Sequence, residues 1–297
     1  MHDQRKADLY GLATVCIWST VASAFKIALR HMDPLQLLSA ATVVSIATLA
    51  AILALQGRLN TLRDFTGRDL LRCAGLGMLN PFLYYVVLFQ AYDLLPAQEA
   101  QPLNYTWAIT LALLSIPLLR QKVRPRDMAA VLTSYAGVVV ISTHGDPLNL
   151  HFSNGLGVAL ALGSTVIWAL YWIFNAKQRR DPVAGLLLSF LFGLPAVLAA
   201  TAAFSSLPVL SAPIAGEGLL AAAYVGLFEM GVTFVLWLTA LRLTYSAARI
   251  GNLIFLSPFL SLVFIHFLVG EEILPSTFVG LVFIIAGNAI QTFGRKA

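Results

Sequence analysis

The chain has 297 residues, of which 59% are hydrophobic and only 11% are charged, and its formal net charge is +5. A soluble globular domain carries about 25% charged residues, so most of this protein's surface must face lipid rather than water. Inside a bilayer the backbone has to satisfy its own hydrogen bonds, which leaves helices or closed barrels. Barrel strands alternate apolar and polar residues, whereas this chain has apolar runs of about twenty residues, the length of a membrane-spanning helix. We therefore expect an all-α membrane protein.

Ten apolar segments follow one another along the chain. They are expected at 8–30, 34–56, 69–92, 96–119, 126–144, 154–176, 183–204, 217–241, 245–269 and 275–294. Asp33-Pro34 and Asp181-Pro182 each place a capping residue before a proline at the first helical position, which predicts a helix start. Gly145-Asp146-Pro147 separates two halves, 1–145 and 146–297, of one integral membrane domain.

The basic residues predict the orientation of the chain. With the N-terminus inside, 17 of the 19 Lys and Arg residues fall on the cytoplasmic side, and the exceptions are Lys26 and Arg30. This asymmetry follows the positive-inside rule and predicts that both termini are cytoplasmic, in a bacterial inner membrane. These charges face the headgroups of membrane lipid, so they do not indicate nucleic-acid binding. Lys26 and Lys177 lie near helix ends and are expected to extend toward the interface.

The two halves of the sequence repeat each other. With an offset of 150 residues, Ile17-Trp18 falls on Ile167-Trp168, Pro125 on Pro275, and Ala136-Gly137 on Ala286-Gly287. Several matches at nearly one offset indicate a duplication. Five segments in each half force the halves into opposite orientations, and inverted five-helix repeats are typical of transporters with a midplane substrate site. The sequence thus predicts ten transmembrane helices in two inverted five-helix repeats.

Three tryptophans are expected near the middle of the membrane. Trp18, Trp107 and Trp168 lie well inside their segments. A midplane indole N–H needs a partner or a cavity. Either these rings pack between helices, or they form a stacking wall around an aromatic or cationic solute. Trp237 lies close to Arg242 and is interpreted instead as an anchor at the interface.

Two segments combine proline with polar side chains at membrane depth. Asn80 and Pro81 lie near the centre of the third segment, with Tyr84 one turn later, and the fourth segment carries Pro102 and Asn104. Proline removes a backbone donor and kinks a helix, and broken polar helices are tolerated at depth where they line a cavity. We therefore take these residues as candidates for a substrate site. A structural kink held by polar contacts between helices is the alternative.

Glu229 is the acidic residue that the sequence places near the membrane middle. A carboxylate at that depth is costly, and a solute amine, an exchangeable proton or a structural hydrogen bond would each offset the cost. Glu99 and Arg249 occupy equivalent positions in the two halves. Inversion puts these two residues on opposite sides of the membrane, so we take them, with Pro102, as candidate gate residues.

Small residues recur in the last segment of each half. They include Gly137 in the fifth segment and Gly280 and Gly287 in the tenth. Small residues at this spacing allow close approach of helices, so the pattern predicts either packing or dimerisation.

The second half carries motifs that resemble the drug/metabolite transporter superfamily, in its ten-helix EamA-type branch. These motifs are Ala240-Leu241, Ser246-Ala247-Ala248, Leu256-Ser257-Pro258, Gly270-Glu271, Pro275, Gly280 and Ala286-Gly287. The first half departs from the pattern at Arg120-Gln121-Lys122, where a Gly-Glu pair is usual, and it has no counterpart of Pro258. The resemblance implies a secondary transporter for a small-molecule substrate, working by alternating access.

Within that branch, the chain looks most like the YddG-type exporters of aromatic amino acids. The likeness is carried by Asn80-Pro81, Tyr84-Tyr85, residues 98–107 (QEAQPLNYTW), Trp18 and Trp168. The resemblance implies export of phenylalanine, tyrosine and tryptophan, with flat organic cations as a further class. Proton coupling is left open.

Neither ATP-driven transport nor metal chemistry is indicated by the sequence. It contains no G-x-x-x-x-G-K-S/T segment that would cradle a nucleotide phosphate and no H-E-x-x-H segment that would bind zinc. We therefore expect no enzyme activity and no cofactor. A membrane enzyme and a structural membrane protein are the alternative classes, and solute flux through liposomes would separate a transporter from both.

Overall fold

A computed structural model describes residues 3–119, 125–146, 148, 153–176, 178, 180–206, 216–244, 250 and 253–293. Within these ranges every regular element is a helix, as expected for an all-α protein. Up to residue 142 the elements are α1 (Gln4–Leu29), α2 (Pro34–Leu55), η1 (Leu59–Asp64), α3 (Gly67–Gly77), η2 (Met78–Leu83), α4 (Tyr84–Leu94), α5 (Ala97–Asn104), α6 (Trp107–Leu119) and α7 (Pro125–Ser142). From residue 155 they are α8 (Gly155–Asn175), α9 (Pro182–Phe204), α10 (Gly216–Tyr224), η3 (Val225–Val232), α11 (Thr233–Leu243), η4 (Ile254–Leu256), α13 (Ser257–Phe264), η5 (Ile265–Val269) and α14 (Pro275–Phe293).

Six helical stretches in the described part of the chain are long and apolar enough to cross a membrane. They are Gln4–Leu29, Pro34–Leu55, Gly67–Leu94, Gly155–Asn175, Pro182–Phe204 and Gly216–Leu243. Shorter apolar helices lie at Met128–Ser142, Ser257–Val269 and Pro275–Ile290. By length and composition, the chain can therefore cross a membrane several times.

The two predicted aspartate–proline helix starts are present. Asp33 accepts hydrogen bonds from the backbone N–H groups of Leu35 at 2.9 Å and Gln36 at 3.0 Å, and the Gln36 side chain accepts one from the Asp33 N–H at 3.1 Å. This reciprocal capping box satisfies donors that a helix N-terminus leaves unpaired. Asp181 caps α9 by accepting hydrogen bonds from the N–H groups of Val183 and Ala184 at 3.0 Å each, without the reciprocal bond.

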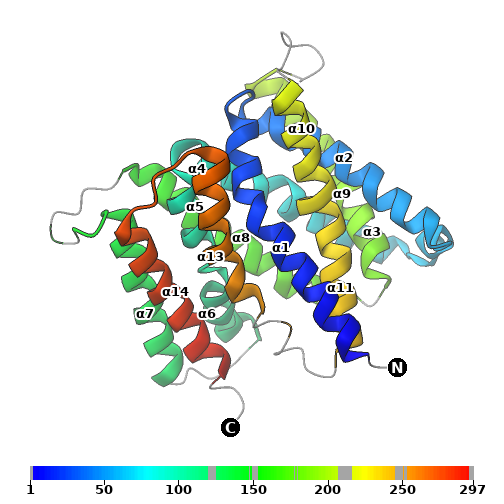
Figure 1. The fold of residues 1–297 in the computed structure, drawn as a ribbon. Coiled ribbons are helices and arrows are strands. Elements are labelled where there is room, and N and C mark those ends of the chain that lie inside the picture. The colour runs from blue at the N-terminus through cyan, green and yellow to red at the C-terminus, as the bar shows by residue number, and fades with distance from the viewer. Residues whose placement is uncertain are drawn as a thin grey trace.

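The helices form one bundle around α1 (Figure 1). α1 packs between α10 and α11 on one side and α13 on the other, and α7 and α14 lie side by side at one edge. The opposite edge is built from α2, α3 and α9. α1 begins and α14 ends at the same end of the bundle, so the chain crosses it an even number of times.

The close packing of α7 on α14 depends on glycine. A Cβ atom added to Gly280 would lie 2.6 Å from the carbonyl oxygen of Gly137, and one added to Gly287 would lie 2.6 Å from the carbonyl oxygen of Ala130. Backbone oxygens cannot move aside as a flexible side chain can. The packing role predicted for this small-residue pattern is therefore present within the chain.

Two of the long helices widen into a π-helical segment at their centres. η2 contains Pro81, and Asn80 has extended backbone angles there (φ −143°, ψ 114°), as expected for a helix interrupted by proline. η3 has no proline. Hydroxyl groups donate hydrogen bonds to its backbone carbonyls instead. Ser45 donates to the carbonyl of Met230 at 2.7 Å, and Thr233 donates to the carbonyl of Phe228 at 2.6 Å. Single π-helical turns are frequent at functional sites, and η3 carries Glu229.

The fourth predicted segment is also interrupted. α5 contains Pro102 and ends at Asn104, and α6 begins at Trp107 after a turn at Tyr105 and Thr106. The break therefore follows Pro102 instead of coinciding with it. The change of direction brings side chains of α5 and α6 to the same central space.

Candidate functional site

A cavity of about 90 Å³ lies at the centre of the bundle, between α1, α4, α5, α6, α8, η3 and α11. About 10–15 Å³ of such space holds one water molecule, so this cavity has room for several. All five tryptophans of the sequence line it, namely Trp18, Trp107, Trp168, Trp172 and Trp237. Four helices, α1, α6, α8 and α11, supply these rings, so the fold gathers all the indoles of the chain into one site.

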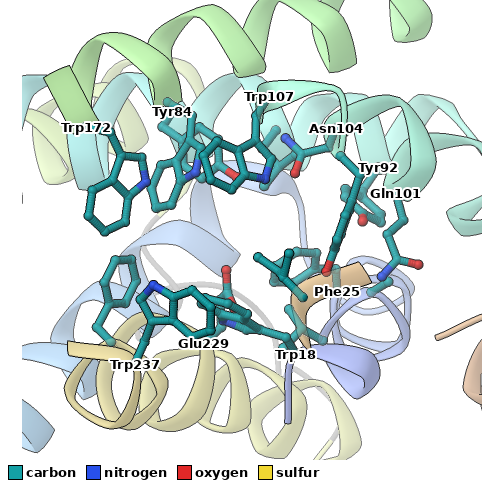
Figure 2. Close-up of a pocket in the computed structure, with 17 residues that line it drawn as sticks. Trp18, Phe25, Tyr84, Tyr92, Gln101, Asn104, Trp107, Trp172, Glu229 and Trp237 are labelled. Atoms are coloured by element: carbon teal, nitrogen blue, oxygen red, sulfur yellow. The ribbon is translucent and has the colours of Figure 1, made fainter. Parts of the chain in front are cut away.

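The aromatic rings form two facing walls. Trp18 and Trp237 lie on one side, from α1 and α11, and Tyr84, Trp107 and Trp172 lie on the other (Figure 2). The ring centroids of Trp18 and Trp237 are 5.4 Å apart. Trp168 stacks on Tyr84 at 4.4 Å, with an angle of 26° between the ring planes. Rings fixed by such contacts offer faces and edges of defined orientation to a flat solute or a cation.

Glu229 brings a carboxylate to this cavity. Its Oε1 accepts a hydrogen bond from the Tyr85 hydroxyl at 3.2 Å, and the Trp18 indole lies beside the carboxylate. Its Oε2 is buried and has no hydrogen-bond partner in the part of the chain that the structure describes. Among the described residues that line the cavity, Glu229 is the only one that carries a formal charge. The site is therefore suited to a solute that presents an ammonium group or another donor.

Neutral polar groups line another part of the cavity, on α5 and the turn after it. Gln101, Asn104 and Tyr105 all contribute. Asn104 donates to the Ser164 hydroxyl on α8 at 2.9 Å. The sequence analysis selected Asn104 as a site residue but not Gln101, although a helix places residues 101 and 104 on one face. The helical period would have found Gln101 from Asn104.

Six of the eight predicted substrate-site residues line the cavity: Trp18, Tyr84, Asn104, Trp107, Trp168 and Glu229. Asn80 and Pro81 are not among its lining residues, so the structure does not place them at this site. Both are buried in η2, and the Pro81 ring lies close to Gly193 on α9. Their interruption of the helix directly precedes Tyr84, which does reach the cavity.

The interpretation of Trp237 as an interface anchor is wrong. Its ring is only 9% exposed, packs against Trp18 and lines the cavity. The nearby Arg242 suggested a position at the membrane surface. Trp237 lies more than one helical turn before Arg242, however, and that distance is enough to carry the ring inward along α11.

Of the three candidate gate residues, two do not line the cavity, and the third lies outside the residues that the structure describes. Glu99 is 1% exposed, and its Oε2 accepts a hydrogen bond from the Ser153 hydroxyl at 2.6 Å. Its Oε1 lies 2.8 Å from His144 Nε2, within hydrogen-bond distance. These contacts fix α5 to the segments that follow α7. Pro102 is buried within α5. Arg249 lies outside the described residues, as does Lys177.

Lys26, expected to extend toward the interface, is held by backbone carbonyls of a neighbouring helix. Its ammonium group donates to the backbone carbonyls of Tyr92 at 2.8 Å and Leu95 at 3.0 Å, at the C-terminal end of α4. The last carbonyls of a helix lack partners within it, and a cation there is favoured by the helix dipole. Lys26 thus ties α1 to α4 beside the cavity.

Glu271, from the Gly270-Glu271 motif, is an anion that binds the N–H groups at the start of α5, whereas Lys26 is a cation that binds carbonyls at the end of α4. Its carboxylate accepts hydrogen bonds from the N–H groups of Ala97 at 2.8 Å and Gln98 at 3.1 Å. The Gln98 side chain returns to the same loop, donating to the Glu272 carbonyl at 2.7 Å and accepting from the Leu274 N–H at 2.9 Å. α5, which carries Gln101 and Asn104, is therefore fixed to the loop between η5 and α14.

A bundle of apolar helices around a central aromatic cavity, with one carboxylate among the described lining residues, is suited to holding a small solute within a membrane. Residues 5–143 and residues 155–293 each match the EamA-like transporter family, so the chain belongs to that family and is a multi-pass membrane protein.

Relatives of known sequence agree with this assignment. A protein of Clostridium kluyveri named as an uncharacterized transporter is 26% identical over 98% of this chain and 94% of its own length. The aromatic amino acid exporter YddG of Ancylobacter novellus is 29% identical over 78% of each chain. A solved crystal structure that is 21% identical shares the fold, with a TM-score of 0.68 over 98% of both chains.

Proposed function

We propose that this protein is a secondary transporter that exports aromatic amino acids, and flat organic cations as a further class, by alternating access across a bacterial inner membrane. The observation that carries the proposal is the gathering of all five tryptophans around one cavity that also holds Glu229. Aromatic walls complement a flat ring, and the carboxylate complements an amine. The similarity to an aromatic amino acid exporter supports the same substrate class.

We further propose ten transmembrane helices in two inverted repeats, residues 1–145 and 146–297. The family model matches twice, once in each proposed repeat. The helix contacts also recur with the repeats exchanged: α1 packs on α11 and α13 as α8 packs on α4 and α6, and α2 packs on η3 as α9 packs on η2. The pairs α2–α9 and α7–α14 are their own counterparts under this exchange. We keep Glu99, Pro102 and Arg249 as proposed gate residues, with Arg249 outside the described part of the chain.

Both termini are expected in the cytoplasm. The structure places the start of α1 and the end of α14 at one end of the bundle, and the positive-inside rule assigns that end to the cytoplasm. Reporter fusions at each terminus, active only on one side of the membrane, measure this directly. A periplasmic signal from either terminus would contradict the proposed orientation.

Proteoliposomes containing the purified protein are expected to show saturable flux of labelled L-tryptophan that empty liposomes lack. Trp18→Ala and Trp168→Ala should each lower this flux ~10-fold, because both remove a ring face against which the solute stacks. The measurement is the initial rate per amount of inserted protein. Phe267→Ala is the matched control, because this side chain is 77% exposed, lies outside the cavity lining and is not expected to change the rate.

Two outcomes would count against the proposal. Absence of flux for every aromatic solute would favour a transporter of another small solute, and absence of flux for solutes of every class would favour a membrane enzyme or a structural membrane protein. Equal loss of flux in Phe267→Ala and the two tryptophan variants would mean that the aromatic substitutions act through folding.

A further inference from the structure

A groove of about 430 Å³ lies between α1, α10 and η5, on the far side of α1 from the central cavity. Thr20, Ala24 and Ile27 of α1 line this groove, whereas Trp18 and Phe25 of the same helix line the central cavity. Residues three or four apart share a face of a helix, so these two sets lie on different faces of α1. α1 therefore separates the groove from the proposed transport site.

The walls of the groove are largely apolar and open to the outside of the bundle. Ile27, Leu220, Ala221 and Leu268 contribute to them, and Leu220 is 74% exposed and Leu268 52% exposed. α1 and α10 both belong to stretches long enough to cross a membrane, so exposed leucines beside them face the hydrocarbon of the bilayer. The groove is therefore accessible to the acyl chains of lipid.

The groove runs from the membrane surface toward the membrane middle. Glu217 lies in the first turn of α10 and Tyr224 at its end, which are separated by roughly 10 Å along the helix axis. At this deeper end the hydroxyls of Tyr224 and Thr20 share a hydrogen bond at 2.6 Å, which joins α10 to α1. The end of α1 and the start of α10 lie at the end of the bundle opposite both termini (Figure 1). In the proposed orientation this is the periplasmic end.

Charged groups of both signs flank the mouth of the groove. The side chain of Glu217 is 66% exposed, and His31 Nε2 lies 3.6 Å from it, too far for a hydrogen bond. Arg30 follows the last residue of α1 and donates to the carbonyl of Val269, next to Leu268 in the groove wall. A guanidinium group has five N–H donors, so one carbonyl occupies only part of it. The mouth thus offers an acceptor on the α10 side and donors on the η5 side.

We propose that this groove binds a phospholipid with an ethanolamine headgroup from the outer leaflet of the membrane. One acyl chain lies between α1 and α10, the ammonium group pairs with Glu217, and the phosphate pairs with Arg30. An ethanolamine headgroup carries three N–H donors for a carboxylate, whereas a choline headgroup has none and a glycerol headgroup has no positive charge. The zwitterion therefore matches both charges at the mouth.

Three other occupants would use the groove differently. Lipid tails that enter it whatever their headgroup would give Glu217 and Arg30 no role in binding. An amphipathic amine would use the carboxylate alone. A second copy of the chain would cover the exposed Leu220 and Leu268 with protein.

The test is thermal unfolding of the detergent-purified full chain, titrated with dioleoyl-phosphatidylethanolamine, with the choline and glycerol lipids of the same acyl chains, and with dodecylamine. In the wild type, half-maximal stabilisation should need a ~5-fold lower concentration of the ethanolamine lipid than of any other probe. Glu217→Gln should raise this concentration to that of the choline lipid, and Arg30→Gln should weaken all three phospholipids. Glu272→Gln is the matched control, because this exposed acid in the loop before α14 does not line the groove, and it should keep the wild-type preference.

Equal concentrations for the three phospholipids in the wild type would overturn the proposal and leave only non-selective contact with lipid tails. A preference that survives in both Glu217→Gln and Arg30→Gln would also overturn it, because the lipid would then bind elsewhere. So would dodecylamine that acts as well as the ethanolamine lipid, or a dimer in sedimentation that Leu220→Asn dissociates. Glu217 and Arg30 do not line the central cavity, so these results are separate from tryptophan flux, which tests the proposed function.

Discussion

Replacing Glu229 by glutamine is expected to weaken the binding of amine-bearing aromatic solutes by ~10-fold or more. The substitution keeps the shape of the side chain and the hydrogen bond from Tyr85, but it removes the charge that faces the cavity. A charge-assisted hydrogen bond is worth about 1.5–3 kcal/mol, roughly a 10- to 100-fold change in affinity. The measurement is the concentration dependence of tryptophan flux, or of thermal stabilisation of the purified protein by tryptophan.

The pH response of the same variant separates two mechanisms. If Glu229 holds the solute amine, affinity falls at every pH. If Glu229 instead carries a proton across the membrane, exchange of tryptophan between the two sides survives in Glu229→Gln, while accumulation driven by a pH gradient disappears. We favour the first mechanism, because the other polar groups that line the cavity in the described residues are neutral amides, hydroxyls and indoles, which form no obvious proton relay.

Glu217→Gln is a matched control for this experiment. Glu217 lies at the start of α10, in the same long helical stretch as Glu229, but its side chain is 66% exposed and lies 3.6 Å from His31. Removing its charge should leave tryptophan affinity unchanged. Full transport by Glu229→Gln, with unaltered affinity and pH response, would contradict both mechanisms and make Glu229 a structural hydrogen-bonding residue.

The sequence was sufficient for the class of fold and for much of the site. Low charge and long apolar runs leave helices as the main solution in lipid, and the aspartate–proline helix starts follow from local capping chemistry. Trp18, Trp107 and Trp168 were selected because they lie deep in apolar segments, where an indole N–H needs a partner or a cavity. The same reasoning identified Glu229, and all four line one cavity.

The sequence did not reveal which polar residues pair across long distances along the chain. Lys26 was assigned to the interface because it is a cation near a helix end, yet the carbonyls it binds lie at Tyr92 and Leu95, more than sixty residues away. Glu271 likewise caps a helix that begins at Ala97. Such partners are set by tertiary packing, which no local pattern encodes.

Gln101 and Trp237 show two different limits of local reasoning. Trp237 was assigned to the membrane interface because it lies close to Arg242 in the sequence. That spacing does not determine whether the ring faces the interface or the central cavity, which it lines. Gln101 was not selected as a site residue, and only the structure shows that it is buried and lines the cavity.

Gly280→Ala is expected to destabilise the protein by ~1–3 kcal/mol, the usual cost of forcing extra atoms into a packed contact. The new Cβ atom would lie 2.6 Å from the carbonyl oxygen of Gly137, so α7 and α14 would have to separate. In the proposed architecture these two helices are the counterparts of each other, and their contact joins the repeats. Thermal unfolding of the detergent-purified protein measures the effect, and Gly280→Leu should increase it.

Gly163→Ala provides the comparison, because Gly163 also lies within a helix, α8, but nothing would lie within 4 Å of an added Cβ atom there. Alanine is a better helix former than glycine by about 1 kcal/mol, so this variant should match or exceed the wild type in thermal stability. If both alanine variants unfold alike, helix propensity alone would explain the data. The glycines would then not be required for the approach of α7 to α14. A loss confined to Gly280→Ala would instead locate the requirement at the carbonyl of Gly137, where the two backbones meet.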